Sequence, residues 1–105
     1  MLGELEQLVL LAVMHVGDDA YGIPVRDAIE RRTSRDLTFG TIYKTLNRME
    51  DKGLVRSRLG PDSAARGGRR TRCYVVTAAG RHALRESLGA LRRMMADLDV
   101  GWESP

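Results

Sequence analysis

Four polar side chains between residues 38 and 52 have the types and the spacing to contact the edges of DNA base pairs. They are Thr41, Lys44, Asn47 and Arg48. At 3.6 residues per helical turn they share one face, opposite an apolar stripe formed by Ile42, Leu46 and Met49. Asparagine can bond an adenine edge and arginine a guanine edge, while lysine and threonine suit phosphates or bases. A solvated helix surface has the same pattern, so the neighbouring segments must distinguish the two interpretations.

The densest positive charge in the chain follows this segment. Residues 60–72 hold four arginines and one acid, Asp62, and their net charge of +3 equals that of the whole chain. The arginines are Arg66, Arg69, Arg70 and Arg72. Arginine bonds phosphate bidentately and suits narrow minor grooves, and Gly67 and Gly68 let the backbone turn sharply. A solvated loop would have this composition too. A Walker-type phosphate loop is excluded, because this loop leads into a strand instead of a helix.

The apolar periodicity predicts a mainly helical chain with one small β-hairpin. We expect helices over residues 2–16, 21–32, 38–52 and 78–100, and strands over 54–59 and 72–77. The order α-α-α-β-β-α is that of a winged helix-turn-helix, in which the third helix enters the major groove and the hairpin, or wing, lies along the backbone or minor groove. The arginine cluster then falls at the tip of the wing, which favours DNA binding over a merely solvated surface.

Three local signals set the ends of these elements. Pro24 is tolerated only in the first turn of the second helix, which therefore starts at residues 21–22. Gly53 suits the left-handed residue that ends the third helix, and the following Leu54 should contact the last helical turn. Thr77 is a suitable N-cap for the fourth helix.

Apolar side chains in the first and fourth helices predict a homodimer. The fourth helix carries a heptad seam of Leu84, Leu88, Leu91, Met95 and Leu98. The first helix places Leu5, Leu8, Val9, Ala12 and Val13 on one face and Leu10, Leu11 and Met14 on others. A monomer this small could hardly cover them all, so we expect a partner subunit to cover Leu5, Leu8 and the heptad seam. Residues 1–77 would form the DNA-binding domain and residues 78–105 the dimerisation helix with a short tail.

Two of the three tyrosines have roles that the sequence leaves open. The hydroxyl of Tyr21 could reach a phosphate from the start of the second helix, or its ring could belong to the core. Tyr43 could contact DNA or pack under the third helix. Tyr74 alternates with Cys73 and Val75 in the second strand and is interpreted as structural.

Other classes of function lack the residues that they need. His15 and His82 lie on different predicted helices without a neighbouring cysteine or acidic cluster, so we expect no metal and no cofactor. No nucleophile–base or paired-carboxylate constellation can be assembled, so we expect no enzyme. A single cysteine, Cys73, suits a reducing cytoplasm, where it would be a small buried side chain or, alternatively, a redox-sensing thiol. The longest apolar run, Leu8 to Met14, is far short of the roughly 20 residues that span a bilayer, and acidic residues stand where a signal peptide is basic.

Four stretches of the sequence resemble the PadR-like bacterial transcriptional regulators. They are LGELEQLVLLAV, DAYGIPVRDAIERRT, FGTIYKTLNRMEDKGLV and RGGRRTRCYVVTAAGRHAL, between about Leu2 and Ala90. The most specific parts are Tyr21-Gly22 and the blocks at 40–54 and 72–80. The resemblance implies a homodimeric repressor that contacts double-stranded DNA with its third helix and wing. Some members bind planar aromatic compounds at the dimer interface, which makes a small aromatic effector there an option for this chain.

The residues that we expect to contact DNA come from the second helix, the third helix and the wing. They are Tyr21, Thr41, Tyr43, Lys44, Asn47, Arg48, Arg66, Arg69 and Arg70. The sequence departs from the family at Pro24, where members often carry an acidic or polar residue, and Trp102 lies past the predicted end of the last helix. The competing interpretation is a winged-helix protein-interaction module, in which the polar face of the third helix meets a partner protein.

Overall fold

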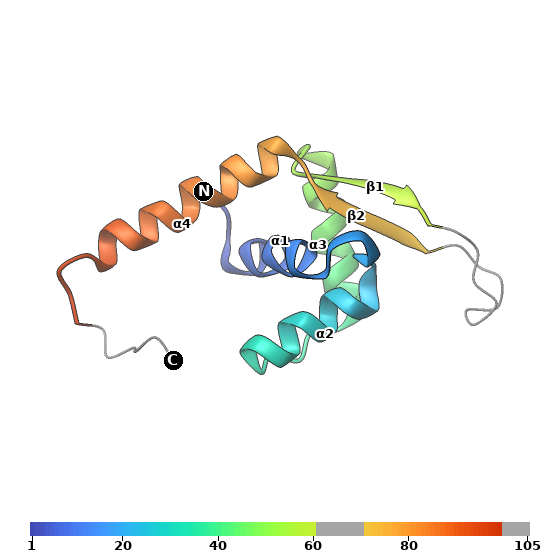
Figure 1. Ribbon diagram of the computed structural model, residues 1–105, viewed down its shortest axis with the longest axis horizontal. Coiled ribbons are helices and arrows are strands. Elements are labelled where there is room, and N and C mark those ends of the chain that lie inside the picture. Colours follow the sequence, from blue (N-terminus) through green and yellow to red (C-terminus); the bar gives the residue numbers. More distant parts are fainter. Residues whose placement is uncertain (61–70, 100–105) are drawn as a thin grey trace.

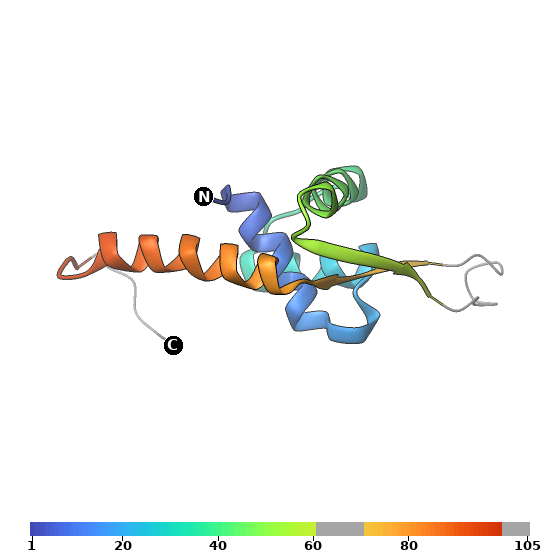
Figure 2. The same cartoon turned by 90° about the horizontal axis from the view of Figure 1, so that it is seen from above.

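The structure, a computed structural model, describes residues 1–60 and 71–99. Its elements are α1 (Glu4–Val16), a 3-10 turn (Gly17–Asp19), α2 (Gly22–Thr33), α3 (Phe39–Asp51), β1 (Val55–Leu59), β2 (Arg72–Val76) and α4 (Ala78–Met95). The predicted order α-α-α-β-β-α is confirmed. Figures 1 and 2 show α1, α2 and α3 packed together, with the hairpin leaving this group on one side and α4 on the other.

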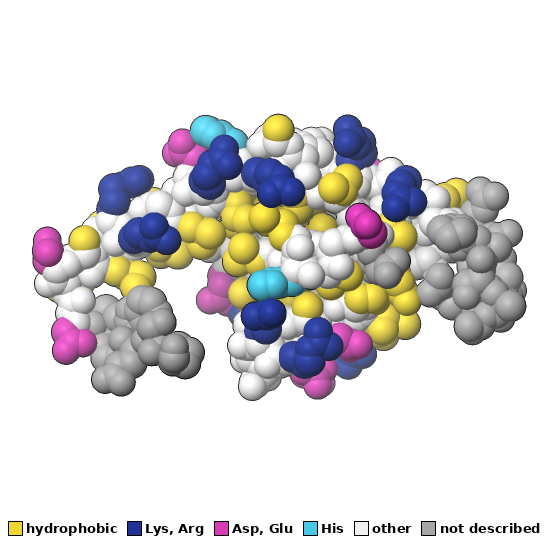
Figure 3. All heavy atoms as spheres, in the orientation of Figure 1, with side chains coloured by type: hydrophobic (Ala, Val, Ile, Leu, Met, Phe, Trp, Pro, Cys, Tyr) yellow, Lys and Arg dark blue, Asp and Glu magenta, His cyan; other side chains and the backbone are white. Residues whose placement is uncertain are grey.

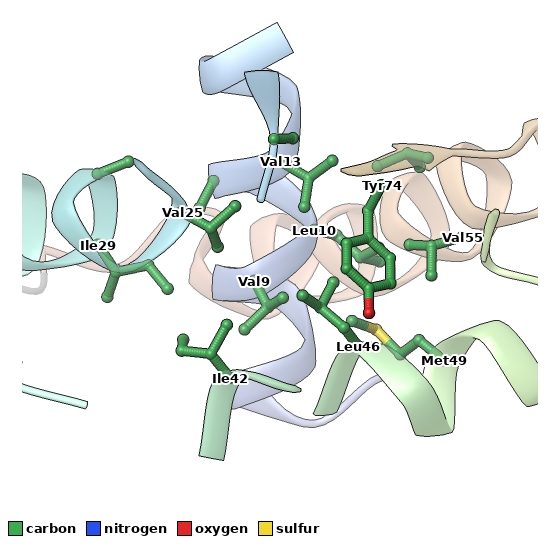
Figure 4. Packing of buried hydrophobic residues seen from close by; sticks show 14 of the residues in the cluster. Val9, Leu10, Val13, Val25, Ile29, Ile42, Leu46, Met49, Val55 and Tyr74 are labelled. Atoms are coloured by element: carbon green, nitrogen blue, oxygen red, sulfur yellow. The ribbon is translucent and has the colours of Figure 1, made fainter. Parts of the chain in front are cut away.

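The core lies where α1 passes between α2, α3 and the inner face of the hairpin (Figure 4). Val9 and Leu10 of α1 are wholly buried, whereas Leu5 and Leu8 are only partly buried. Val9, Ala12 and Val13 of the predicted apolar face are buried, and so is Leu10, which was predicted on another face of the helix. The reason is that α1 is covered from several directions, by α2, α3, β2 and α4, so a single amphipathic face does not describe it.

The connection from α3 to β1 is a complete Schellman motif. Gly53 has φ of 76°, its N–H donates to the Glu50 carbonyl at 2.9 Å, and the Leu54 N–H donates to the Met49 carbonyl at 2.9 Å. Only glycine adopts such a φ without strain. This confirms the predicted stop at Gly53 and fixes the direction in which the hairpin leaves α3.

The hairpin has one buried and one open face. Val55 pairs with Val76 and Ser57 with Tyr74 on the face toward the core, while Arg56 pairs with Val75 and Arg58 with Cys73 on the other. Successive side chains alternate across a strand, so this register directs Tyr74 inward. The ring of Tyr74 is buried among core residues, as predicted for a structural tyrosine.

Helix α4 begins as predicted but ends early. The Thr77 hydroxyl accepts from the Gly80 N–H, which confirms the N-cap. The helix stops at Met95, so the predicted end near Val100 was wrong and Leu98 lies outside the helix. Arg92 and Arg93 sit in its last turn, where positive charge is favourable, whereas extension would put Asp97 and Asp99 at the negative end of the helix dipole. No helix in the described part of the chain is long and apolar enough to cross a membrane.

Candidate nucleic-acid interface

Helix α3 presents its predicted polar face to solvent. Lys44, Asn47 and Arg48 are exposed, while Ile42 and Leu46 on the opposite side are wholly buried. Lys44 has no ion-pair partner among residues 1–60 and 71–99, so its ammonium group is available to a ligand. The centre of the exposed face therefore carries an unneutralised cation.

Thr41, at the start of this face, is partly used by the helix cap. The Thr38 hydroxyl accepts the Thr41 N–H at 3.1 Å, and the two hydroxyl oxygens lie 2.9 Å apart. Thr41 is half-buried. The first turn of α3 is thus fixed by Thr38, and the Thr41 hydroxyl already has a protein partner.

Glu6 of α1 anchors the other edge of α3. Its carboxylate accepts from Lys52 Nζ at 3.2 Å and lies 3.9 Å from Arg48 Nε. The Gly3 N–H donates to its second oxygen at 3.0 Å, and this bond, with Lys52 and Arg48, lowers the pKa of Glu6 against the opposing effect of burial. Arg48 keeps half of its side chain exposed. It can reach a ligand from the α1 edge of the face.

Asn47 is tied to the hairpin by a bond that the sequence did not reveal. The Tyr74 hydroxyl donates to Asn47 Oδ1 at 3.2 Å across 27 residues of sequence. Burial is the largest cause that raises the pKa of Tyr74, so its hydroxyl keeps its proton. Helical periodicity places Asn47 on the polar face of α3. It cannot predict that Tyr74, 27 residues later in the sequence, lies beside Asn47.

A second polar tie lies one turn further along α3. Glu50 Oε2 accepts from the Ser57 N–H at 2.9 Å and from the Ser57 hydroxyl at 2.6 Å, and Arg72 Nη1 donates to that hydroxyl at 2.8 Å. These bonds hold β1 and β2 against the recognition helix. The angle between α3 and the wing is therefore set by hydrogen bonds as well as by packing.

The two remaining aromatic candidates lie near the start of α2. Tyr21 is the half-buried N-cap residue of that helix. Tyr43 projects from α3 and is 36% exposed. Its hydroxyl lies over Gly22, and a Cβ at position 22 would overlap that hydroxyl. A glycine at position 22 is thus what lets the Tyr43 ring cross to α2.

The predicted wing contacts Arg66, Arg69 and Arg70 lie outside the described residues. The strands that lead to them do project away from the helices (Figure 1). Arg56 and Arg58 are exposed on the open face of β1 and were not selected from the sequence. Their alternation with Val55 and Ser57 is the signal that could have placed them there.

The predicted dimer residues fall into two environments. Leu84 is only 4% exposed and packs into the core of its own chain, so little of it is left for a partner. Leu91 is 43% exposed, and Met94, which the heptad did not include, is 76% exposed. Met95 and Leu98 are exposed as well. Figure 3 shows apolar side chains gathered between α4 and α1. Leu88 of α4 and Leu5 and Leu8 of α1 are half-buried.

An open groove of about 700 Å³ lies on the far side of the hairpin from α3. Its lining includes Met14 of α1, Val75 of β2, and the arginines Arg56, Arg58 and Arg81. Among the described residues, no group of three His, Cys, Asp or Glu side chains could hold a metal ion.

These features define a winged helix-turn-helix protein with a polar, cationic recognition helix. The chain belongs to the Transcriptional regulator PadR-like family, whose sequence model matches residues 10–86. Members of this family are DNA-binding regulators, not enzymes.

Solved structures have the same fold. A transcriptional regulator from Clostridium thermocellum superposes with a TM-score of 0.71 at 18% identity, over 87% of this chain and 85% of that one. A PadR-like regulator from Bacillus cereus gives 0.69 at 24% identity over 93% of both chains. A PadR family regulator from Clostridium difficile gives 0.66 at 28% identity, over 89% and 95%. No curated protein matches the chain.

Proposed function

We propose that this transcriptional regulator is a homodimeric repressor that reads an inverted repeat. Each α3 would enter a major groove, and each wing would lie along the backbone or minor groove. The observation that carries this proposal is the outer face of α3, where Asn47 is exposed and Lys44 has no ion-pair partner among the described residues. This face stands beside a hairpin that leads to the three arginines at positions 66, 69 and 70. A helix face that mixes a free cation with amide groups matches the alternation of phosphates and base edges in a major groove.

The dimer follows from α4. The far end of α4 projects away from the other helices (Figure 1), and Leu91, Met94 and Met95 of this helix are exposed. A second copy covering this surface would remove apolar area from water and would pair the two α3 helices. For reading successive turns of DNA, the two helices must stand about 34 Å apart.

Selection of bound fragments from random double-stranded DNA tests this proposal. The expected result is an inverted repeat whose half-sites lie about one helical turn apart. Lys44→Ala should weaken binding to the selected site, while Arg31→Ala, which removes an exposed arginine at the far end of α2, should not. The repressor role is read from a reporter gene placed behind the selected site, whose transcription should fall when the protein is present.

Two outcomes would contradict the proposal. If no DNA is shifted even at low salt, the polar face of α3 instead serves a partner protein. Selected sites without two-fold symmetry would contradict the dimeric mode of reading.

A further inference from the structure

Tyr74 joins three parts of the molecule that meet at the recognition helix. Its ring is buried in the core, and its backbone N–H donates to the Ala20 carbonyl, just before α2, at 2.9 Å. Its hydroxyl donates to Asn47 Oδ1 on α3 at 3.2 Å. Figure 4 shows this hydroxyl pointing toward α3, beside Leu46 and Met49. The buried Tyr74 thus contacts Asn47, which is exposed on the face of α3 that a ligand would meet.

The bond from Tyr74 gives the oxygen and the nitrogen of the Asn47 amide different surroundings. Oδ1 accepts from Tyr74, so one of its two lone pairs is used inside the protein. The amide nitrogen carries two protons and has no partner among residues 1–60 and 71–99. Asn47 therefore offers the two N–H groups of its side-chain amide as hydrogen-bond donors to a ligand on the α3 face.

The position of Tyr74 relative to Asn47 is itself fixed. Ser57 is the cross-strand partner of Tyr74, and it is bonded to Glu50, which follows Asn47 by about one turn of α3. The paired residues Ser57 and Tyr74 are thus each hydrogen-bonded to a side chain of α3. The bond from the buried Tyr74 to Asn47 and the bond from the half-buried Ser57 to Glu50 therefore join the two strands to α3 side by side.

We propose that Tyr74 is a positioning residue for base recognition, which holds Asn47 with its amide nitrogen outward so that Asn47 selects guanine. This inference rests on the proposed reading of DNA by α3. Guanine offers two neighbouring acceptors, N7 and O6, in the major groove, whereas adenine offers one acceptor and one donor. An asparagine matches adenine only when its oxygen is free to accept from N6. Tyr74 uses one of the two lone pairs of that oxygen and so competes with adenine N6 for it.

The test compares the wild-type protein with Tyr74→Phe, Asn47→Ala and the double variant on the selected operator. The position read by Asn47 is first found as the base pair at which Asn47→Ala loses its preference. At that position the wild-type protein should prefer guanine, and Tyr74→Phe should shift the guanine-to-adenine affinity ratio toward adenine by about fivefold or more, the lower range for a base contact. In the Asn47→Ala background, Tyr74→Phe should change the ratio no further.

Two features keep this test independent of folding. Phenylalanine retains the buried ring, and a ratio of affinities measured with one variant cancels any loss of folded protein. Ser57→Ala is the matched control, because it removes a hydroxyl from the same strand pair but keeps the bond from the Ser57 N–H to Glu50, so that Tyr74 stays in place beside Asn47. It should leave the base preference at this position unchanged.

Any of three results would overturn the inference while leaving the DNA-binding proposal intact. They are a wild-type preference for adenine at this position, an unchanged ratio in Tyr74→Phe, and an equal shift in the Asn47→Ala background. Absence of any selected sequence would instead overturn the proposed function, and this inference with it.

Discussion

The backbone N–H of Leu2 donates to the buried hydroxyl of Ser87 at 2.9 Å, which joins the start of the chain to the middle of α4. The Gln7 amide donates to the Leu2 carbonyl at 2.9 Å from the other side. The residues before α1 are therefore held between α1 and α4, and they help to fix α4 to the helices that form the core.

Ser87→Ala should lower the free energy of unfolding by about 1–3 kcal/mol, because it leaves the buried Leu2 N–H without its acceptor. Urea unfolding measures this difference. Glu86→Ala, at an exposed neighbouring position, should change the value by no more than about 0.5 kcal/mol. Equal effects of the two substitutions would show that the bond to Leu2 adds nothing.

Two glycines of α4 should respond to alanine in opposite directions. A Cβ at Gly80 would overlap the Leu54 carbonyl oxygen and lie 2.8 Å from Val76 Cγ1, so Gly80→Ala must displace the hairpin and should destabilise the fold strongly. At Gly89 the nearest atom is the end of the Arg93 side chain at 3.4 Å, so Gly89→Ala should raise the free energy of unfolding by roughly 0.5–1 kcal/mol through helix propensity. Thermal unfolding of both variants checks the contrast. A stable Gly80→Ala protein would contradict the close approach of α4 to Leu54.

The carboxylate of Glu6 should make the fold sensitive to acid. The Gly3 N–H, Lys52 and Arg48 lower its pKa in the folded state, so its contribution is complete above the unfolded pKa and is lost as the pH falls through the lower, folded pKa. Unfolding in urea at a series of pH values should therefore show a stability difference between wild type and Glu6→Gln that is largest near neutral pH and shrinks below about pH 4. A difference that is the same at all pH values would mean that Glu6 acts through its shape and not its charge.

The wing arginines should contribute mainly salt-sensitive affinity. Arg69→Ala combined with Arg70→Ala should weaken binding to all DNA sequences and flatten the dependence of log affinity on log salt by about one unit per lost phosphate contact. Arg31→Ala combined with Arg32→Ala, at the exposed end of α2, removes the same charge elsewhere and serves as the control. A slope that stays unchanged in the wing variant would remove these arginines from the interface.

Disrupting the apolar surface of α4 should separate the subunits. Leu91→Glu combined with Met95→Glu places charges on the exposed side that we propose as the interface. Sedimentation of this variant should show a particle near the 11.7 kDa of one chain, whereas the wild type should sediment as twice that mass. Arg93→Glu, on the opposite side of the helix, should remain dimeric. A wild-type protein that sediments as a single chain at micromolar concentration would contradict the dimer itself.

Local signals predicted the ends of α3 and the start of α4 well, because each depends on a few adjacent residues. Gly53 adopts the left-handed conformation that glycine favours, and the Thr77 hydroxyl caps the next helix. The end of α4 was missed because the apolar spacing continues to Leu98 past the point where the helix has left its domain. Periodicity reports which side of a helix is apolar, and it does not report where neighbouring contacts cease.

The candidate interface was predictable in composition but not in its internal bonds. The helix period placed Lys44, Asn47 and Arg48 on one exposed face, as the structure does. The partners of two of them come from other elements, Glu6 from α1 and Tyr74 from β2. Such pairs depend on the tertiary arrangement of segments that are distant in sequence, which no single pattern contains. Whether these residues contact DNA stays a prediction.

The corner at residues 53–54 brings the end of α3 against the start of α4. The Thr77 hydroxyl donates to the Gly53 carbonyl at 2.7 Å, the Thr77 N–H donates to the Leu54 carbonyl at 3.1 Å, and Gly80 lies directly against that same carbonyl. Helix α4 therefore starts against the peptide groups at which α3 ends, and two hydrogen bonds join them there although residues 52–77 separate the two helices in sequence. In a dimer held by α4, a tilt of one subunit against the other would move each α3 together with its own α4. The spacing between half-sites would then be altered by changing the tilt of the α4 pair, without any change to a residue that faces DNA.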